Sequence, residues 1–220
     1  MPAIVVVPVV LTLLAAAVGY AQEGGSANYL HWSRQQAEAV GRSTRVDGRV
    51  GGAFDFRVLR TERSYNYKLR ATLMTPDVIR ATARLAQLSN GLSNEEAAAL
   101  VTEAEQAGDL VIMFEIDPRE GSGVVPLDML VLLRPKGAED PVIRGALTPT
   151  LRNVRALAGA YRRDYAYEQF WAVFQLDERS LALLAPGVSE FEFVVRIYDK
   201  EGRVSWRVPD ALRRRAAKRH

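Results

Sequence analysis

Residues 65–117 decide the fold class, and they read YNYKLRATLMTPDVIRATARLAQLSNGLSNEEAAALVTEAEQAGDLVIMFEID. Apolar and polar side chains alternate over residues 65–74, which is typical of a half-buried strand. Residues 109–117 have a continuous apolar centre, which indicates a strand buried on both faces. In the segment between these two strands, the apolar residues recur at helical intervals instead. The segment therefore predicts a helical hairpin, residues 76–107, inserted between two strands.

The two helices of this insert have recognisable ends. Pro76 suits the first helical position, because its missing N–H would have no partner there, and Thr75 precedes it as the N-cap. Gly91 stops the first helix. Ser93 and Glu96 then match a capping box, in which each side chain bonds the backbone N–H of the other residue. A helix, a tight turn and a second helix are therefore expected.

Most of the remaining sequence is β-like. Residues 53–59, AFDFRVL, alternate aromatic and charged side chains and predict a hairpin partner for residues 65–74. Further strands are expected at residues 127–134, 142–147, 165–176, 190–198 and 203–209. Residues 199–202 predict a hairpin turn, with Gly202 supplying a positive φ. The expected fold is mainly β or α+β: an antiparallel β-sandwich, immunoglobulin-like in general architecture, with the inserted helical hairpin.

Two more helices are predicted outside the insert. One runs from Asn28, as its N-cap, to Gly41. The other covers residues 148–163 and begins at Thr148-Pro149, although Gly159 weakens it.

These patterns divide the chain into four parts. Residues 1–21 are expected to be a signal peptide, and residues 22–44 a linker with a short helix. Residues 45–209 form the β-rich domain with its helical insert, and residues 210–220 a basic tail. Apolar residues make up 48% of the chain and charged residues 25%, which is ordinary for a globular protein.

The N-terminal segment indicates export. It is apolar from Ile4 to Val18, and the small residues Gly19 and Ala21 occupy the positions that a signal peptidase requires. Cleavage is expected after Ala21. A retained membrane anchor is the alternative, but spanning needs about 20 apolar residues and this run is shorter and contains Pro8. The expected location is periplasmic or extracellular.

The residue inventory excludes several kinds of site. The chain has no cysteine, so disulfides, thiolate metal sites and cysteine nucleophiles are excluded. His31 and His220 are its two histidines, which excludes a multi-histidine metal site. A Gly-x-Ser-x-Gly nucleophile elbow and a phosphate-binding glycine loop are also missing. The sequence therefore predicts no metal and no cofactor.

The stretch RRDYAYEQF, residues 162–170, shares basic and aromatic positions with the strand signature of RNA-recognition motifs. However, Asp164 stands in place of the signature glycine, and Glu168 in place of an aliphatic residue. A carboxylate among core side chains is costly, and both acids would repel phosphate. Nucleic-acid binding is therefore not expected. The stretch is instead expected to be a core strand, with Phe170 and Phe174 on one face and Tyr165 and Tyr167 on the other.

A cluster of carboxylates supports a catalytic alternative. Asp117, Glu120 and Asp128 are the candidate catalytic residues, because two carboxylates about 5–10 Å apart can hydrolyse a glycosidic bond. Their spacing matches no calcium-binding loop. Carboxylates beside proline and glycine are also usual at solvated turns, which is the structural alternative.

The C-terminal tail holds the basic character of the chain. It contributes five positive charges through Arg213, Arg214, Arg215, Lys218 and Arg219. The net charge of the whole chain is only +3, so the other residues are net −2. Such a tail is more typical of a solvated end, and contact with an anionic surface is the alternative. Being charged and following a proline, it is expected to contribute little to the core.

The function that these patterns favour is a non-catalytic binding or scaffold module of the bacterial cell envelope, with an unknown protein or polysaccharide partner. The alternative is a carboxylate-based, glycosidase-like hydrolase that uses the acidic loop residues. Exposed aromatic side chains on one face would favour sugar binding. Two carboxylates that converge in a pocket would favour an enzyme.

Overall fold

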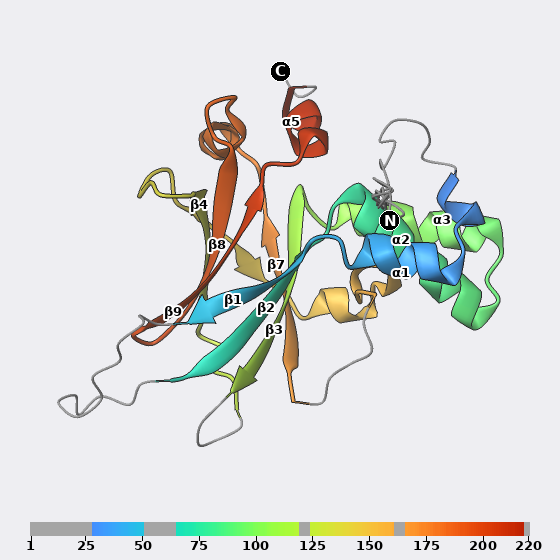
Figure 1. The fold of residues 1–220 in the computed structure, drawn as a ribbon, viewed down its shortest axis with the longest axis horizontal. Coiled ribbons are helices and arrows are strands. Elements are labelled where there is room, and N and C mark those ends of the chain that lie inside the picture. The colour runs from blue at the N-terminus through green and yellow to red at the C-terminus, as the bar shows by residue number, and fades with distance from the viewer. Residues whose placement is uncertain (1–27, 51–64, 119–123, 161–165, 218–220) are drawn as a thin grey trace, which may run out of the picture.

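The computed structural model describes residues 28–50, 65–118, 124–160 and 166–217. The described part has a mixed α and β fold in which a group of helices lies beside antiparallel strands (Figure 1). The strands are β1 (Arg45–Val50), β2 (Tyr67–Leu73), β3 (Leu110–Pro118), β4 (Leu130–Pro135), β5 (Ile143–Arg144), β6 (Ala146–Leu147), β7 (Glu168–Phe174), β8 (Glu190–Ile197) and β9 (Lys200–Arg207). Their order is β5-β4-β8-β9-β1-β2-β3-β7-β6.

Strand β1 belongs to two sheets. Its first four residues pair with β2, and its last two pair with β9. Gly48 lies at this crossing, where an added Cβ would be 2.9 Å from the Val204 side chain and 3.0 Å from that of Leu69. Glycine permits such a close approach of backbones inside a strand. The first sheet therefore contains β1, β2, β3, β7 and β6, and the second contains β5, β4, β8, β9 and β1.

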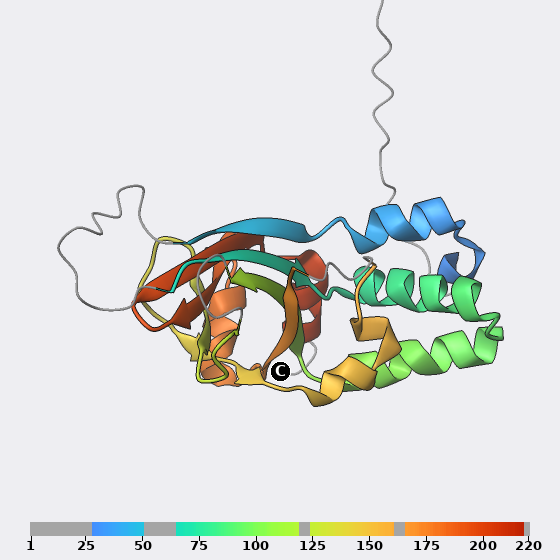
Figure 2. The same cartoon turned by 90° about the horizontal axis from the view of Figure 1, so that it is seen from below.

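Alternate side chains of both sheets pack into one apolar core, around which the strands curve (Figure 2). The ring of Phe193 lies 5.4 Å from that of Phe114 and 6.2 Å from that of Phe174. Phe170 stacks on Phe114 at 5.4 Å. The predicted burial of Phe170 and Phe174 is therefore confirmed. Each such side chain contributes roughly 1.5–3 kcal/mol of apolar burial.

The opposite face of the first sheet is covered in part by the helices. Helix α2 (Pro76–Asn90) and helix α3 (Asn94–Gln106) form the predicted hairpin, and α1 (Arg34–Gly41) packs beside α2. Met113 and Trp171 are buried in a second apolar cluster with residues of α2 and α3. Strand β3 is thus buried on both faces, as predicted.

The ends of the helical hairpin agree with the sequence signals. The Thr75 hydroxyl accepts from the Val78 N–H at 3.3 Å. Gly91 closes α2 in the left-handed conformation, with φ 67°. Ser93 and Glu96 form both bonds of the capping box, at 3.1 Å and 2.7 Å.

Two other helix predictions need correction. The helix predicted at 148–163 is not an α-helix over its described residues, 148–160, where two 3₁₀ turns, η3 (Thr150–Asn153) and η4 (Arg155–Leu157), replace it. Val154 between them is extended, and this lets Leu151, Val154 and Leu157 all enter the second apolar cluster. Near the N-terminus a 3₁₀ turn, η1 (Asn28–His31), precedes α1, whose N-cap is Ser33 rather than Asn28.

The remaining strand predictions have mixed outcomes. The strands at 109–117, 127–134 and 190–198 are confirmed within two or three residues. The predicted strand at 53–59 and Tyr165 lie outside the described residues. Tyr167 is buried on the face opposite Phe170, and the Arg70 guanidinium lies 4.1 Å above its ring.

The described part of the C-terminal tail, residues 210–217, belongs to the fold, contrary to the prediction. Helix α5 (Asp210–Ala217) packs beside the sheets, and Leu212 is buried in the main core. The Arg213 guanidinium donates to the carbonyls of Leu184, Ala185 and Val188 at 3.0, 2.8 and 2.5 Å. A charged segment can therefore be anchored by one apolar residue and by backbone carbonyls that need donors.

Candidate functional site

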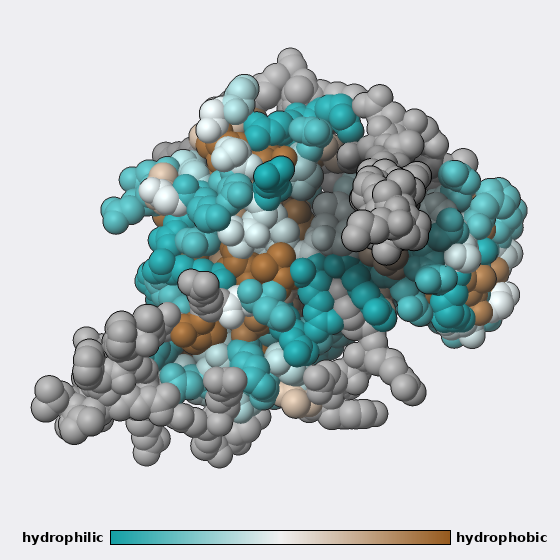
Figure 3. All heavy atoms as spheres, in the orientation of Figure 1, coloured by the Kyte–Doolittle hydropathy of each residue, from teal (hydrophilic) through white to brown (hydrophobic). Residues whose placement is uncertain are grey.

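The candidate site is the end of the sheets farthest from the helices, which we call the mouth. We define it by Tyr65, Tyr67, Val124, Leu127, Glu168, Tyr198 and Lys200. Large apolar side chains are exposed here: Val124 by 63%, Leu127 by 80% and Tyr198 by 60%. Hydrophobic atoms reach the surface beside the β8–β9 hairpin in Figure 3. Clustered exposed apolar side chains mark interaction sites more often than scattered ones do.

Three tyrosines connect the core to the surface at the mouth. The Tyr67 hydroxyl donates to the Val195 carbonyl and accepts from the Gly202 N–H, both at 2.6 Å. The ring of Tyr65 lies 6.0 Å from that of Tyr67 and 6.3 Å from that of Tyr198, which it meets edge-on. Burial raises the pKa of Tyr67 far above its ordinary value. Its hydroxyl therefore stays protonated and holds the two sheets together.

Tyr65 fixes the chain segment that follows β3. Its hydroxyl donates to the Val124 carbonyl at 2.9 Å, so the exposed Val124 is tied to the tyrosine series. Burial first, then the nearby Glu168 carboxylate, raises the pKa of Tyr65. The start of β7 therefore contributes a negative charge to the same site.

Tyr198 occupies a strained turn. Ile197 pairs with Lys200, so the turn between β8 and β9 consists of Tyr198 and Asp199. Tyr198 has φ 52°, and such a left-handed conformation is unusual for a bulky residue. Strain of this kind persists where surrounding structure enforces it, and it is concentrated at functional sites.

The turn predicted at residues 199–202 is therefore wrong. Gly202 lies inside β9, and an added Cβ there would be 2.8 Å from the Tyr67 hydroxyl oxygen. The glycine is needed for the approach of Tyr67 and not for a positive φ.

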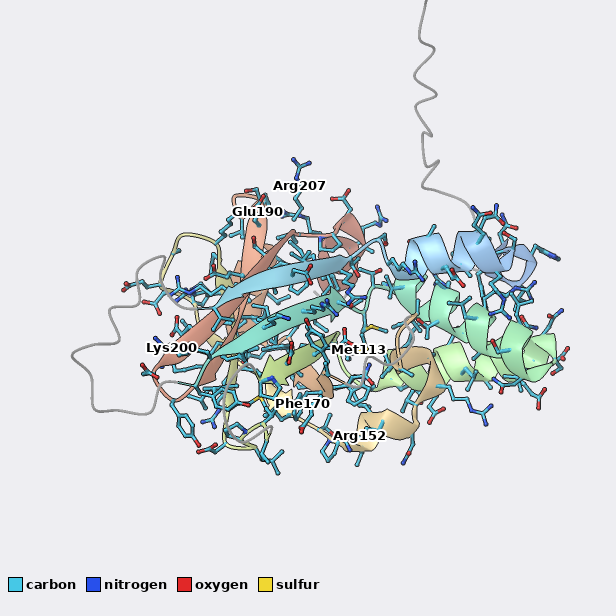
Figure 4. The ribbon with its side chains drawn as sticks, turned by 60° about the horizontal axis from the view of Figure 1, so that its bottom comes forward. Met113, Arg152, Phe170, Glu190, Lys200 and Arg207 are labelled. Carbon is cyan, nitrogen blue, oxygen red and sulfur yellow. The ribbon has the colours of Figure 1, made fainter. Side chains whose placement is uncertain are left out.

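Charged groups complete the mouth. Lys200 is a buried cation at the start of β9, with its ammonium 3.9 Å from the Asp199 carboxylate. Figure 4 shows Lys200 at the end of β9 remote from the helices. The exposed Glu168 pairs in register with Ile116, at the start of β7. The exposed Tyr198 ring, the aliphatic side chains and the exposed Glu168 carboxylate are thus available to a ligand, whereas Tyr67 and Lys200 are buried.

The described members of the predicted catalytic set, Asp117 and Asp128, are in different settings. The Asp117 carboxylate lies 3.1 Å from the Lys68 ammonium, across the pair of strands β2 and β3. Asp128 is exposed on the turn before β4. Glu120 lies outside the described residues. The structure therefore shows Asp117 in a cross-strand ion pair and Asp128 on a solvated turn.

The part of the chain that the structure describes has no cluster of three or more His, Cys, Asp or Glu that could hold a metal ion. Within the same ranges, no helix has the length and apolar character needed to span a membrane.

The predicted anion-binding residues divide into different roles. Arg213 is engaged by three carbonyls, whereas Arg214 is exposed on α5. The structure does not describe Lys218, Arg219 or the side chain of Arg215.

The tyrosines of the mouth were not identified as site residues from the sequence. Tyr65 and Tyr67 were recognised only as members of an alternating strand. A tyrosine beside Asp in a β-hairpin turn, where Gly or Asn is usual, is the one local signal that pointed to Tyr198.

Comparison with known proteins assigns no family to the chain. The sequence matches no protein-family model and no curated protein. A crystal structure of a novel protein of unknown function from Burkholderia pseudomallei K96243 is similar, with a TM-score of 0.41 and 12% sequence identity. The match covers 68% of this chain and 78% of that chain.

Proposed function

We propose that this chain is an exported, non-catalytic binding module of the bacterial cell envelope, and that it holds a protein partner at the mouth. The observation that best supports this proposal is the state of Tyr198, a bulky residue that has φ 52° and is 60% exposed. A strained and exposed aromatic residue lowers stability, so a function in binding explains why it is present.

The composition of the mouth favours a protein partner over a polysaccharide. Val124 and Leu127 are aliphatic and exposed. Val124 is linked to Tyr198 through Tyr65, whose hydroxyl bonds the Val124 carbonyl and whose ring meets that of Tyr198. Aromatic and aliphatic anchors with a charged rim are typical of protein interfaces. A polysaccharide site would instead be expected to present a broader aromatic platform.

The hydrolase alternative gains no support from the described geometry. A glycosidase needs one carboxylic acid that donates a proton and one free carboxylate. Asp117 is paired with Lys68, and Asp128 points into solvent from a turn.

For the architecture, we infer an antiparallel sandwich, because the inner faces of both sheets contribute to one apolar core. The shared strand β1 distinguishes it from the two separate sheets of an immunoglobulin domain.

Partner capture from envelope extracts tests the proposal with three forms of the protein: wild type, Tyr198→Ala and Leu88→Ala. Leu88 is a matched control, since it is an exposed apolar residue on α2, far from the mouth. We expect the wild type and the Leu88 variant to retain the same protein. Tyr198→Ala removes a central aromatic anchor, which should weaken the binding free energy by about 2 kcal/mol. The affinity for the partner, and with it the retention, should then fall roughly 30-fold. Equal capture by all three forms, or retention of polysaccharide alone, would contradict the proposal.

Export is tested separately by N-terminal sequencing of the purified protein. We expect the mature chain to begin at Gln22, because Gly19 and Ala21 fit the signal peptidase requirement. An intact Met1 in purified membranes would establish an anchor instead.

A further inference from the structure

The end of the sheets opposite the mouth presents a cationic surface on a fixed support. Helix α5 is held there by the buried Leu212 and by Arg213, whose guanidinium donates to three carbonyls. Arg213 is therefore not available to a ligand. The helix is thus held against the sheets, and Arg214 is exposed on it.

Exposed cations lie on this end, which we call the basic end. Arg207 closes β9 and Arg214 lies on α5, and both are exposed. Arg215, Lys218 and Arg219 follow in the sequence. Residues 207–220 contain six Lys and Arg residues and a single acidic residue, Asp210. Glu190, which lies opposite Arg207 in the strand pair, is paired with Lys136. Figure 4 shows Arg207 projecting from the sheet beside Glu190. Positive charge is thus in excess.

We propose that the basic end binds an anionic membrane surface and thereby directs the mouth away from that surface. The occupant is a lipid surface rather than a nucleic acid, because residues 207–220 contain no Phe, Tyr or Trp on which bases could stack. The apolar N-terminal run, residues 4–18, also brings the chain to a membrane during export or anchoring. Anionic lipid attracts clustered Lys and Arg without requiring a shaped pocket.

Strand β9 sets the orientation. It begins at Lys200 in the mouth and ends at Arg207, and its eight residues span about 25 Å. Figures 1 and 4 show the β8–β9 hairpin and α5 at opposite ends of the sheets. A molecule bound through α5 therefore leaves the mouth open to a partner.

Vesicle co-sedimentation of the full chain tests the binding. Vesicles of phosphatidylcholine mixed with phosphatidylglycerol are compared with neutral phosphatidylcholine vesicles, which report any binding by the apolar N-terminal segment. The test variant is Arg207→Gln with Arg214→Gln. The control is Arg34→Gln with Arg42→Gln, two exposed arginines at α1. A cation near anionic lipid contributes roughly a fivefold increase in affinity, so the test pair should weaken binding about 30-fold. The control pair should leave it unchanged.

Salt provides a second criterion. Affinity for the anionic vesicles should fall as salt rises towards physiological ionic strength, where the screening length is about 8 Å. Equal binding to neutral and anionic vesicles, or equal losses in the two double variants, would overturn the proposal. Binding to a soluble polyanion but not to anionic vesicles would overturn it as well.

The orientation is tested with single labels, since the chain has no cysteine of its own. An environment-sensitive fluorophore is attached through Ala211→Cys on α5 or through Leu127→Cys at the mouth. Anionic vesicles should change the emission of the label at residue 211 and leave that at residue 127 unaffected. A response at residue 127 as large as that at residue 211 would refute the orientation, whatever partner the mouth binds.

Discussion

The mouth and the basic end lie at opposite ends of the same strands. They differ in how fully their side chains are buried or hydrogen-bonded. At the basic end, Trp206 donates to the Thr44 carbonyl at 2.6 Å, and Leu212 is buried in the core. At the mouth, Tyr198 is strained and Leu127 is 80% exposed. One end therefore adds stability, whereas the other keeps apolar surface that folding does not use. This difference is one ground for our proposal that the mouth binds a partner.

The largest expected effect comes from the core near the basic end. Phe174→Ala removes a fully buried ring that packs on Phe193, so we expect a loss of about 3–5 kcal/mol in the free energy of unfolding. Urea denaturation measures it. The exposed Val142→Ala should change the same quantity by less than about 0.5 kcal/mol. An unaltered midpoint for Phe174→Ala would mean that the core is placed wrongly.

The same substitution at the two ends sharpens the comparison. Leu212→Ala should lower the free energy of unfolding by about 2–4 kcal/mol, because it opens a cavity beneath α5. Leu127→Ala should leave it nearly unchanged, because that side chain lies in solvent. Thermal unfolding of both variants checks this contrast. Equal losses at the two positions would show that the mouth is as well packed as the basic end.

Tyr67→Phe tests the link between the sheets. Removing the hydroxyl leaves the Val195 carbonyl and the Gly202 N–H without this partner, so we expect a loss of about 1–3 kcal/mol at neutral pH. The raised pKa of Tyr67 gives a second signature. In the unfolded chain the hydroxyl ionises near its ordinary pKa of 10.0, whereas in the folded chain it ionises at higher pH.

The stability that Tyr67 provides is therefore complete below pH 10.0 and falls as the pH rises above that value. Thermal unfolding of wild type and Tyr67→Phe between neutral pH and alkaline pH should show their difference shrinking above pH 10.0. A constant difference would mean that the hydroxyl ionises equally in both states.

The smallest expected effect isolates the strain at the turn. Tyr198→Gly and Tyr198→Ala both remove the ring, but only glycine adopts φ 52° without a steric penalty. The glycine variant should therefore be more stable than the alanine variant by about 1 kcal/mol. Chemical denaturation of the pair measures this difference. A more stable alanine variant would show that the turn relaxes when the ring is removed.

The parts that the sequence predicted correctly depend on local signals. Thr75, Gly91 and the capping box of Ser93 with Glu96 lie within a few residues of the helix ends that they define. The burial of β3 on both faces was also visible in its continuous apolar run. Such signals need no knowledge of distant segments, which is why the helical hairpin was predicted within about one residue.

The parts that failed depend on contacts between distant residues. Gly202 resembled a turn glycine, but it makes room for Tyr67, which is 135 residues away. Gly48 lets β1 pass from β2 to β9, a role that depends on a strand about 150 residues later in the chain. The tyrosines of the mouth meet for the same reason, so a single sequence could not bring them together.

The sharing of β1 between the two sheets has a consequence for folding during synthesis. Residues 45–48 can pair with β2 early, but Arg49 must wait for Arg203, which is made 154 residues later. Contacts between segments so far apart form slowly, and an incomplete chain cannot form them at all. The helical hairpin can fold as soon as it is synthesised, whereas the core between the sheets stays open until the last strand is complete. The core between the sheets therefore closes only after β9 has been made, which is compatible with the export that we propose, because an export channel passes chains that have no closed core.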